Sequence, residues 1–313
     1  MSEDKPANGI ADTGGAAPSI SIVIASKVGA PFLDKCLDSI ENQVNRHGAE
    51  VVVVVSGGGS EVERLGAKYP WVRAEPAVDI KQVPALRRRG VEVSTGEIVF
   101  VIEEHCSAGD DWLDKGLEAH ASGDYAAVGG PIFDDDYPQA SDWTTYFIEY
   151  NTAIPPFPKG ETHLLNDANI AYRRPVLERH MELLGAGYWP MAVHPSIAAE
   201  GGKFFMVPDM RVLHLGPWDY TYYLDQRYHF SRAFAGERAK NEPMTKRIAY
   251  LLLAPILPFL LLARIGKTVL SKGHLVGRFL KTTPWIFPAL VVYVAGEWMG
   301  YLAGPGDSLS KVE

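Results

Sequence analysis

Cysteine is scarce in this chain of 313 residues, where it occurs only at Cys36 and Cys106. Two widely separated thiols provide no disulfide framework and too few ligands for a structural zinc site, so the composition indicates a reducing compartment. An excess of positive charge is missing as well, because the formal net charge is −8. This balance argues against a nucleic-acid partner.

The amino-terminal segment lacks the apolar stretch of a signal peptide or a membrane anchor. Residues 1–18 contain early acidic residues, glycine and proline, which predict a flexible tail. A dinucleotide fingerprint is also absent, because no G-x-G-x-x-G follows the first expected strand, SISIVIA (19–25). Its absence counts strongly against one alternative function, a nucleotide-dependent oxidoreductase on a doubly wound sheet.

The chain does contain, from residue 19 to about 215, an alternation of short β runs and helical patterns. Apolar residues recur at helical spacing over residues 31–47, directly before the buried run VVVVV (51–55). Further strands are expected at WVRAE (71–75), VFVI (99–102) and AAVGGPIF (126–133). Strands separated by helices of this length predict right-handed crossovers, and therefore an α/β fold with a mostly parallel sheet flanked by helices.

Polar residues stand where three of these strands end: Ser26 after the first, Ser56 and Gly57 after the second, and Glu103, Glu104 and His105 after VFVI. In open sheets of this type, ligands bind beyond the carboxyl ends of the strands. We therefore expect these residues at a ligand crevice; the alternative is a solvated loop after a core strand. Cys106 is expected to be a packed residue, because the sequence places no base near it.

Five segments resemble, in their order and spacing, glycosyltransferases of family 2, which have the Rossmann-like GT-A fold. They are ISIVIASKVGAPFLDKCLDSI, VVVVVSGGGS, RRRGVEVSTGEIVFVIEEH, LLNDANIAYRR and FFMVPDMRVLHL, and their order and spacing resemble the family over about residues 19–240. In this family Asp-x-Asp follows the fourth strand and binds ribose and a divalent cation. Here that position reads Glu103-Glu104-His105, which resembles a subset of the family with histidine after an acidic residue.

The resemblance implies a divalent metal, Mn²⁺ or Mg²⁺, held by Glu103, His105 and His214. It also implies a nucleotide-sugar site made of Ser26, Ser56, Gly57, Arg89, Glu103, Glu104 and Arg227. A literal Asp-x-Asp at residues 134–136 ranks second as a metal site, because it falls one strand too late in the family order.

Two departures from the family pattern affect the expected site. A glycine run follows Ser56 where the family has a base-binding aspartate, and the acceptor-activating acid falls on Trp189-Pro190. Proline cannot accept a proton, so His194 and Asp167 are the substitute bases, with a structural role as the alternative for each. The Gln-x-x-Arg-Trp spacing of processive synthases is absent, which argues against a polymer synthase.

Two apolar stretches, residues 248–263 and 285–303, stand out near the C-terminus. The first contains two prolines and is shorter than the ~20 residues that a span needs. Because basic residues flank it on both sides, we expect residues 241–306 to form an apolar helical hairpin on the cytoplasmic face of the inner (plasma) membrane, interfacial or re-entrant, followed by a tail over 307–313. Two full spans and a soluble hairpin are the alternatives.

The resemblance therefore implies a membrane-associated, inverting enzyme. It would move a sugar from a nucleoside diphosphate donor to a lipid-linked or cell-envelope glycan acceptor. The alternative function is a catalytically degenerate transferase-like scaffold in a glycan assembly complex, which Pro190 and the missing base-binding aspartate favour.

Overall fold

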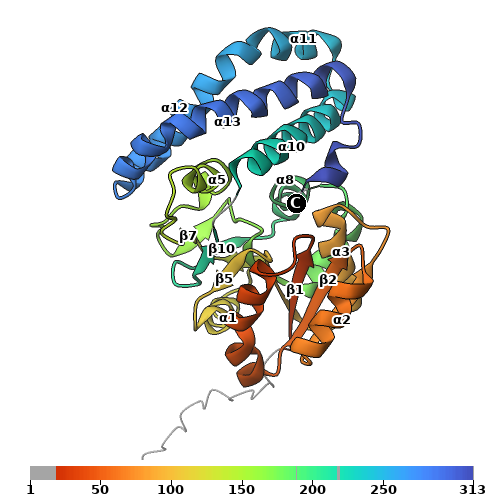
Figure 1. Ribbon diagram of the computed structural model, residues 1–313. Coiled ribbons are helices and arrows are strands. Elements are labelled where there is room, and N and C mark those ends of the chain that lie inside the picture. The colour runs from red at the N-terminus through yellow and green to blue at the C-terminus, as the bar shows by residue number, and fades with distance from the viewer. Residues whose placement is uncertain (1–18, 188, 217–218, 313) are drawn as a thin grey trace, which may run out of the picture.

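A computed structural model describes residues 19–187, 189–216 and 219–312 of the chain (Figure 1). The tail expected over residues 1–18 lies outside the described residues. We call residues 19–216 the sheet half and residues 219–312 the helical half. In Figure 1 the helical half lies across one end of the sheet half.

A central sheet of eight strands has the order β3-β2-β1-β4-β9-β6-β10-β8. Its strands are β1 (Ile20–Ser26), β2 (Glu50–Ser56), β3 (Val72–Ala77), β4 (Ile98–Ile102), β6 (Ala127–Gly129), β8 (Gly160–Thr162), β9 (Asn169–Arg173) and β10 (Phe204–Met206). The strands β3, β2, β1 and β4 pair in parallel, whereas β9 is antiparallel to both of its neighbours and β8 is antiparallel to β10. The sheet is thus mostly parallel, as the apolar runs predict.

Helices cover both faces of this sheet because its central strands are apolar on both sides. Ile22 and Ile24 of β1 pack with α1 (Phe32–His47), α2 (Gly59–Lys68) and α4 (Trp112–Ala121). Val23, which points the other way, packs in the cluster with Val91 of α3 (Val83–Val93). The same face carries the short helices α6 (Arg174–Arg179), α7 (Met181–Leu184), α8 (Trp189–Ala192) and α9 (His194–Ala199).

A second sheet of three strands brings distant segments to the tip of β4. It consists of β5 (Cys106–Ala108), β11 (Val212–His214) and β7 (Ile132–Asp134), in the order β5-β11-β7. The strand expected over residues 126–133 is therefore split into β6 and β7. Gly130 lies between them, where an added Cβ would lie 1.8 Å from the Met210 backbone oxygen. In the resulting register His214 faces Cys106 on one side and Asp134 on the other.

The helical half begins with α10 and continues into an apolar hairpin. Its elements are α10 (Tyr220–Asn241), α11 (Met244–Leu253), η2 (Ala254–Ile256), α12 (Leu257–Lys272), α13 (Val276–Ala303) and η3 (Ser308–Lys311). Small residues let α13 approach α10 closely: a Cβ added at Gly296 would lie 2.1 Å from the Ser231 Oγ, and one at Gly300 would lie 2.6 Å from the Arg232 backbone oxygen.

Two further features tie the helical half to the sheet half. The Phe279 ring of α13 lies 5.4 Å from the Phe147 ring of α5 (Asp142–Glu149), between ring centroids. The expected tail over residues 307–313 instead folds back as far as it is described. Val312 is buried, and its backbone oxygen accepts a hydrogen bond from the Lys27 Nζ.

Candidate active site

The two glutamates at the tip of β4 have different surroundings. The buried Glu104 carboxylate accepts four hydrogen bonds, at 2.7–2.9 Å, from the Ser26 hydroxyl and from the backbone N–H groups of residues 27–29. These bonds shape the loop between β1 and α1. Ser26 and Glu104 were both expected to bind the nucleotide sugar, and a contact between Glu104 and ribose would now have to displace one of these donors.

Glu103 instead faces a polar cluster. Its carboxylate contacts the Arg87 Nη2 at 2.8 Å, the Tyr150 hydroxyl at 2.7 Å and the His105 Nε2 at 3.1 Å. Burial by itself raises the pKa of Glu103, but His105, Arg87 and Tyr150 outweigh it and hold that pKa below its usual range. The Glu103 side chain is therefore a carboxylate, the form that can bind a cation.

His214 lies edge-on to His105, with 5.2 Å between the ring centroids. The Tyr137 hydroxyl contacts both the Nδ1 of His214, at 2.6 Å, and its backbone oxygen, at 2.8 Å. Because a hydroxyl has one proton and a carbonyl oxygen only accepts, the proton of Tyr137 goes to the carbonyl and the Nδ1 donates to Tyr137. The lone pair of His214 is then on its Nε2, which is the tautomer that metal-binding histidines adopt.

The donor set around Glu103 fits a divalent cation. Candidate ligand atoms of Glu103, His105 and Cys106 lie within 4.8 Å of one another. Burial raises the pKa of the Cys106 thiol well above its usual value, and Glu103 raises it further, so this sulfur stays protonated. Burial lowers the pKa of His105, but pairing with Glu103 outweighs it and raises that pKa above its usual value, so a bound cation would have to displace the proton of this imidazole. A carboxylate and neutral imidazoles are ligands that Mn²⁺ accepts. We therefore take Glu103 and His105 as the donors. His214, the third predicted ligand, lies edge-on to His105 but is not a member of this group.

Residues 134–136 do not join this group. No metal-compatible cluster of the described residues includes them, and the Asp136 Oδ1 is paired with the Arg278 Nη2 at 3.0 Å. Their second rank as a metal site agrees with this arrangement.

Of the three consecutive arginines on α3, the structure brings Arg87 to the cluster and not Arg89. The Arg87 guanidinium is buried and pairs with both Glu103 and Asp167. Arg89, which was expected to bind the nucleotide sugar, is partly exposed and pairs with Glu75 of β3. The difference follows from helical geometry, because residues two apart on a helix point to different sides.

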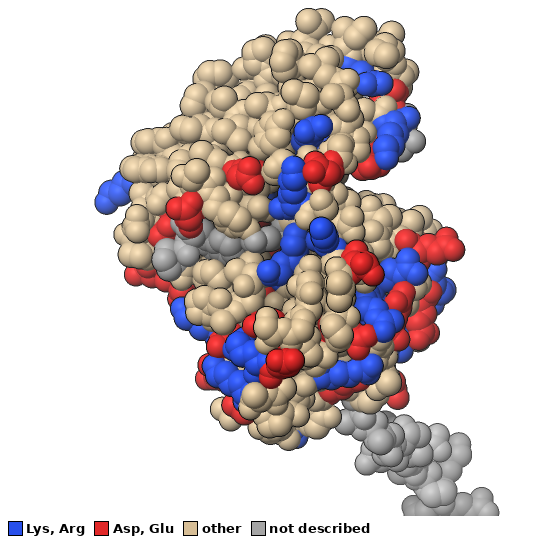
Figure 2. All heavy atoms as spheres, turned by 45° about the vertical axis from the view of Figure 1, so that its right-hand side comes forward, with Lys and Arg blue, Asp and Glu red and all other residues tan. Residues whose placement is uncertain are grey.

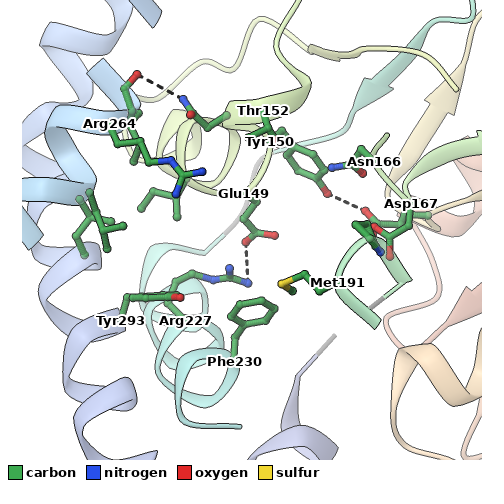
Figure 3. A pocket seen from close by; sticks show the side chains of 17 residues that line it. Glu149, Tyr150, Thr152, Asn166, Asp167, Met191, Arg227, Phe230, Arg264 and Tyr293 are labelled. Carbon is green, nitrogen blue, oxygen red and sulfur yellow. Dashed lines mark hydrogen bonds and ion pairs between the residues drawn. The ribbon is translucent and has the colours of Figure 1, made fainter. Parts of the chain in front are cut away.

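A pocket of about 340 Å³ opens in front of Glu103, between the two halves of the molecule (Figure 3). Asp167 lies on one side, and Arg227 of α10 and Arg264 of α12 lie on the other. The Glu149 carboxylate, at the end of α5, pairs with the Arg227 Nη2 at 2.9 Å. The pocket is thus completed by the helical half and contains both signs of charge.

Two of the carboxylates that line this pocket have raised pKa values. Burial is the main cause for both Asp167 and Glu149, and the guanidiniums of Arg87 and Arg227, respectively, partly offset it. A raised pKa makes a carboxylate a better proton acceptor than an exposed one. Asp167, predicted as a substitute base, therefore lines the pocket and has a pKa raised in the direction that favours proton uptake.

Other predicted residues lie outside the pocket lining. The Ser56 hydroxyl donates to the Ile80 backbone oxygen at 2.9 Å, and Gly57 adopts a left-handed conformation (φ 87°) in the turn after β2. His194, the first residue of α9, is buried, and its Nε2 lies 2.6 Å from the Tyr172 hydroxyl. We therefore keep Asp167, and not His194, as a candidate base.

Glu149 and Tyr150 were missed because α5 has the composition of a core helix. Its sequence, DWTTYFIE, is rich in aromatic residues, and most of it is buried. The available signal was the charged residue at the end of such a segment, since glutamate is rarely buried without a partner.

Comparison with known proteins gives a family match and a curated relative. Residues 21–181 match the family model described as Glycosyl transferase family 2. The glycosyltransferase AglE of Haloferax volcanii is 25% identical over 120 residues. That match covers 37% of this chain and 40% of AglE, so the chain spans less than half of that relative.

Two solved structures share the fold. The mannosyltransferase PcManGT from Pyrobaculum calidifontis, in complex with GDP-Man and Mn²⁺, aligns over 92% of this chain and 88% of its own, with a TM-score of 0.56 and 18% identity. GalNAc-T7 with UDP, GalNAc and Mn²⁺ aligns over 65% of this chain and 44% of its own, with a TM-score of 0.51 and 16% identity. The likeness establishes a GT-A fold.

Proposed function

This chain belongs to glycosyl transferase family 2, and from that membership we propose that it transfers a sugar from a nucleoside diphosphate to a lipid-linked or cell-envelope acceptor. The observation that carries the proposal is the group of Glu103, His105 and Cys106, whose candidate ligand atoms lie within 4.8 Å of one another, with His214 edge-on to His105. Together these residues combine a carboxylate with two imidazoles at the sheet edge where ligands of such folds bind.

The side chains of Glu103, His105 and His214 would hold Mn²⁺ or Mg²⁺. When bound, this cation neutralises charge on the leaving diphosphate. Arg87 positions the Glu103 carboxylate, and Tyr137 sets the tautomer of His214. PcManGT and GalNAc-T7, whose structures contain Mn²⁺, support this assignment.

Asp167 and Glu149 are the two candidates for the base in an inverting displacement. Both line the pocket in front of Glu103, and burial raises the pKa of each. The acceptor hydroxyl gives its proton to one of them as its oxygen attacks the anomeric carbon. Replacing each with its amide identifies the base, because the base variant loses transfer to the acceptor while it still binds the donor.

The enzyme lies on the cytoplasmic face of the plasma membrane, with the hairpin in the membrane interface. Two helices, 244–272 and 276–303, are long and apolar enough to span a bilayer, which is weak evidence by itself. However, α13 contacts the sheet half through Phe279 near one end and α10 through Gly300 near the other. A helix that packs on protein near both of its ends is better suited to lie in the interface than to cross the membrane. The upper lobe in Figure 2 is largely uncharged, which supports such a contact.

The test combines ligand binding with turnover. We expect UDP or GDP with Mn²⁺ to raise the melting temperature of the detergent-solubilised chain, and a panel of sugar nucleotides with native membranes to reveal transfer. His105→Ala should remove the shift, whereas His274→Ala, at an exposed position on the hairpin, should leave it unchanged.

The second candidate function is a transferase-like scaffold without activity. Pro190 lies in the pocket lining, at the position where the family has a catalytic acid, and this favours the scaffold. Absence of any nucleotide-dependent shift in the wild type, together with absence of transfer, would contradict the enzyme and leave the scaffold.

A further inference from the structure

A second hollow, of about 720 Å³, adjoins the pocket. We call it the apolar groove. Its lining includes Pro190, Met191, Phe230, Phe234, Leu309 and Val312. The first three of these also line the pocket in front of Glu103, so the two hollows share a wall.

The chemistry of the groove differs from that of the pocket. Among the described lining residues only Glu237 and Arg238 are charged, and both come late in α10. The Arg238 guanidinium lies over the Phe234 ring, 4.6 Å from its centroid, and its Nη1 donates to the Tyr301 hydroxyl at 2.8 Å. A glycan or a peptide carries donors and acceptors along its whole length and would lose hydrogen bonds to water in such a groove. A hydrocarbon chain would lose none.

The apolar groove runs along α10, the helix that precedes the hairpin. The α10 residues of the lining run from Phe230 to Arg238, away from Arg227 in the pocket. A few residues beyond Arg238 the chain enters α11, whose Met244 and Ile248 side chains are 62% and 49% exposed. The groove thus lies along α10, the helix that continues into this exposed apolar surface.

The C-terminal segment forms one wall of the groove. Leu309 and Val312 line it, and this segment is held in place by side chains of α10 and by Lys27 of the sheet half, whose Nζ donates to the Val312 backbone oxygen. The Gln226 Nε2 donates to the Lys311 backbone oxygen at 3.0 Å, and the His229 Nδ1 lies 3.1 Å from the Ser308 Oγ. The groove is therefore enclosed by ordered contacts of the folded chain.

We propose that the apolar groove binds the hydrocarbon chain of a membrane-lipid acceptor, whose polar head then reaches the pocket beside Glu103. This inference rests on the proposed transferase function and specifies its acceptor class. The volume falls within the ~300–1,000 Å³ usual for small-molecule sites. A lipid from the membrane fits better than a soluble glycan because the groove provides apolar contacts and lies along the helix that continues into the apolar hairpin.

Photolabelling of the full chain in nanodiscs tests the groove directly. The probe is farnesol with a diazirine near the end of its chain, and labelled peptides are identified by mass spectrometry. We expect labelling of α8, of α10 between residues 230 and 238, and of residues 307–312. Ala233→Trp, which fills the groove from α10, should reduce this labelling at least fivefold. Leu302→Trp, at an exposed position on α13, should not change it.

Each result decides between two conclusions. Labelling confined to the outer faces of α11 and α12 contradicts the proposal that the apolar groove binds a hydrocarbon chain. If Ala233→Trp misfolds, as its unfolding temperature would show, Leu309→Trp fills the groove from the opposite wall and must give the same loss. If nucleotide raises the melting temperature but the groove is not labelled, this inference alone is wrong. If the groove is labelled but nucleotide neither raises the melting temperature nor supports transfer, the proposed enzyme is wrong and the groove is a lipid site only.

Discussion

In the sheet half the apolar segments pack against one another and are buried, whereas in the helical half many apolar side chains are exposed. The residues of β4 are 0–2% exposed, but Leu252 and Phe259 of the hairpin are 75% and 60% exposed. Within the helical half, 17% of the apolar stretch in residues 244–272 is buried, against 44% of that in residues 276–303. Similar residue types thus make a core in one half and an exposed surface, mainly on α11 and α12, in the other.

The largest effect is expected from changing that surface. Replacing Leu252, Leu253, Phe259 and Leu260 with serine removes four exposed apolar side chains, each worth about 1.5 kcal/mol or more on burial in lipid. The sum, about 6 kcal/mol, should move the protein from the membrane pellet to the soluble fraction while its unfolding temperature stays nearly constant. Serine at Val78, Leu164 and Leu213, the matched exposed sites of the sheet half, should change nothing. A quadruple variant that still pellets with membranes contradicts the interfacial hairpin.

The next effect separates the two glutamates at the sheet edge. Glu103→Gln should lower turnover by about 100-fold or more, because the amide is a poor ligand for a cation and a poor partner for Arg87. Glu104→Gln should instead lower the free energy of unfolding by about 2–3 kcal/mol, because an amide N–H faces donors that need an acceptor. Steady-state kinetics and urea unfolding measure the two. Loss of turnover in Glu104→Gln together with loss of stability in Glu103→Gln would contradict this assignment of the two glutamates.

These two glutamates also show how far the sequence could be interpreted. The apolar run over residues 99–102 predicts a buried strand, and the topological rule then predicts the crevice at its end. The order of the motifs predicts the GT-A fold. All three follow from patterns along the chain, and the structure and family match confirm the fold.

The remaining features depend on packing between distant segments. Which of Glu103 and Glu104 faces the pocket is set by the loop after β1, which binds Glu104. Which arginine enters the site is set by the rotation of α3 on the sheet, and this selects Arg87. Glu149 has a charged partner in the pocket because α10 brings Arg227 against the end of α5. None of these relations has a period or a motif in the sequence.

The contact within the helical half gives a smaller effect. Gly296→Ala should lower the free energy of unfolding by about 2 kcal/mol, because its Cβ would lie 2.1 Å from the Ser231 Oγ and 2.3 Å from the Tyr228 backbone oxygen. Gly277→Ala, on the same helix with nothing within 4 Å, should instead stabilise by about 0.5 kcal/mol. Urea unfolding of the solubilised chain measures both. Equal effects at the two positions would mean that α13 does not pack on α10 as described.

The smallest effect concerns acid and belongs to the sheet half. Burial lowers the pKa of both His120 and His194 from 6.5 to about 4. Between these values the unfolded chain binds more protons than the folded one, so the free energy of unfolding falls as pH decreases. The slope is at most about 1.4 kcal/mol per pH unit for each histidine. Urea unfolding at pH 7.5, 6.0 and 5.0 measures it for the wild type.

Comparison with glutamine variants isolates the two imidazoles from every other titrating group. Glutamine retains an amide that can contact the Ala171 oxygen, the partner of His120, or the Tyr172 hydroxyl, the partner of His194, but it does not titrate. His120→Gln and His194→Gln should therefore each reduce the acid slope by a similar amount, whatever their effect at pH 7.5. An unchanged slope in either variant means that the imidazole takes up its proton without unfolding. That side of the sheet half would then be open to water, unlike the dry core inferred from its packing.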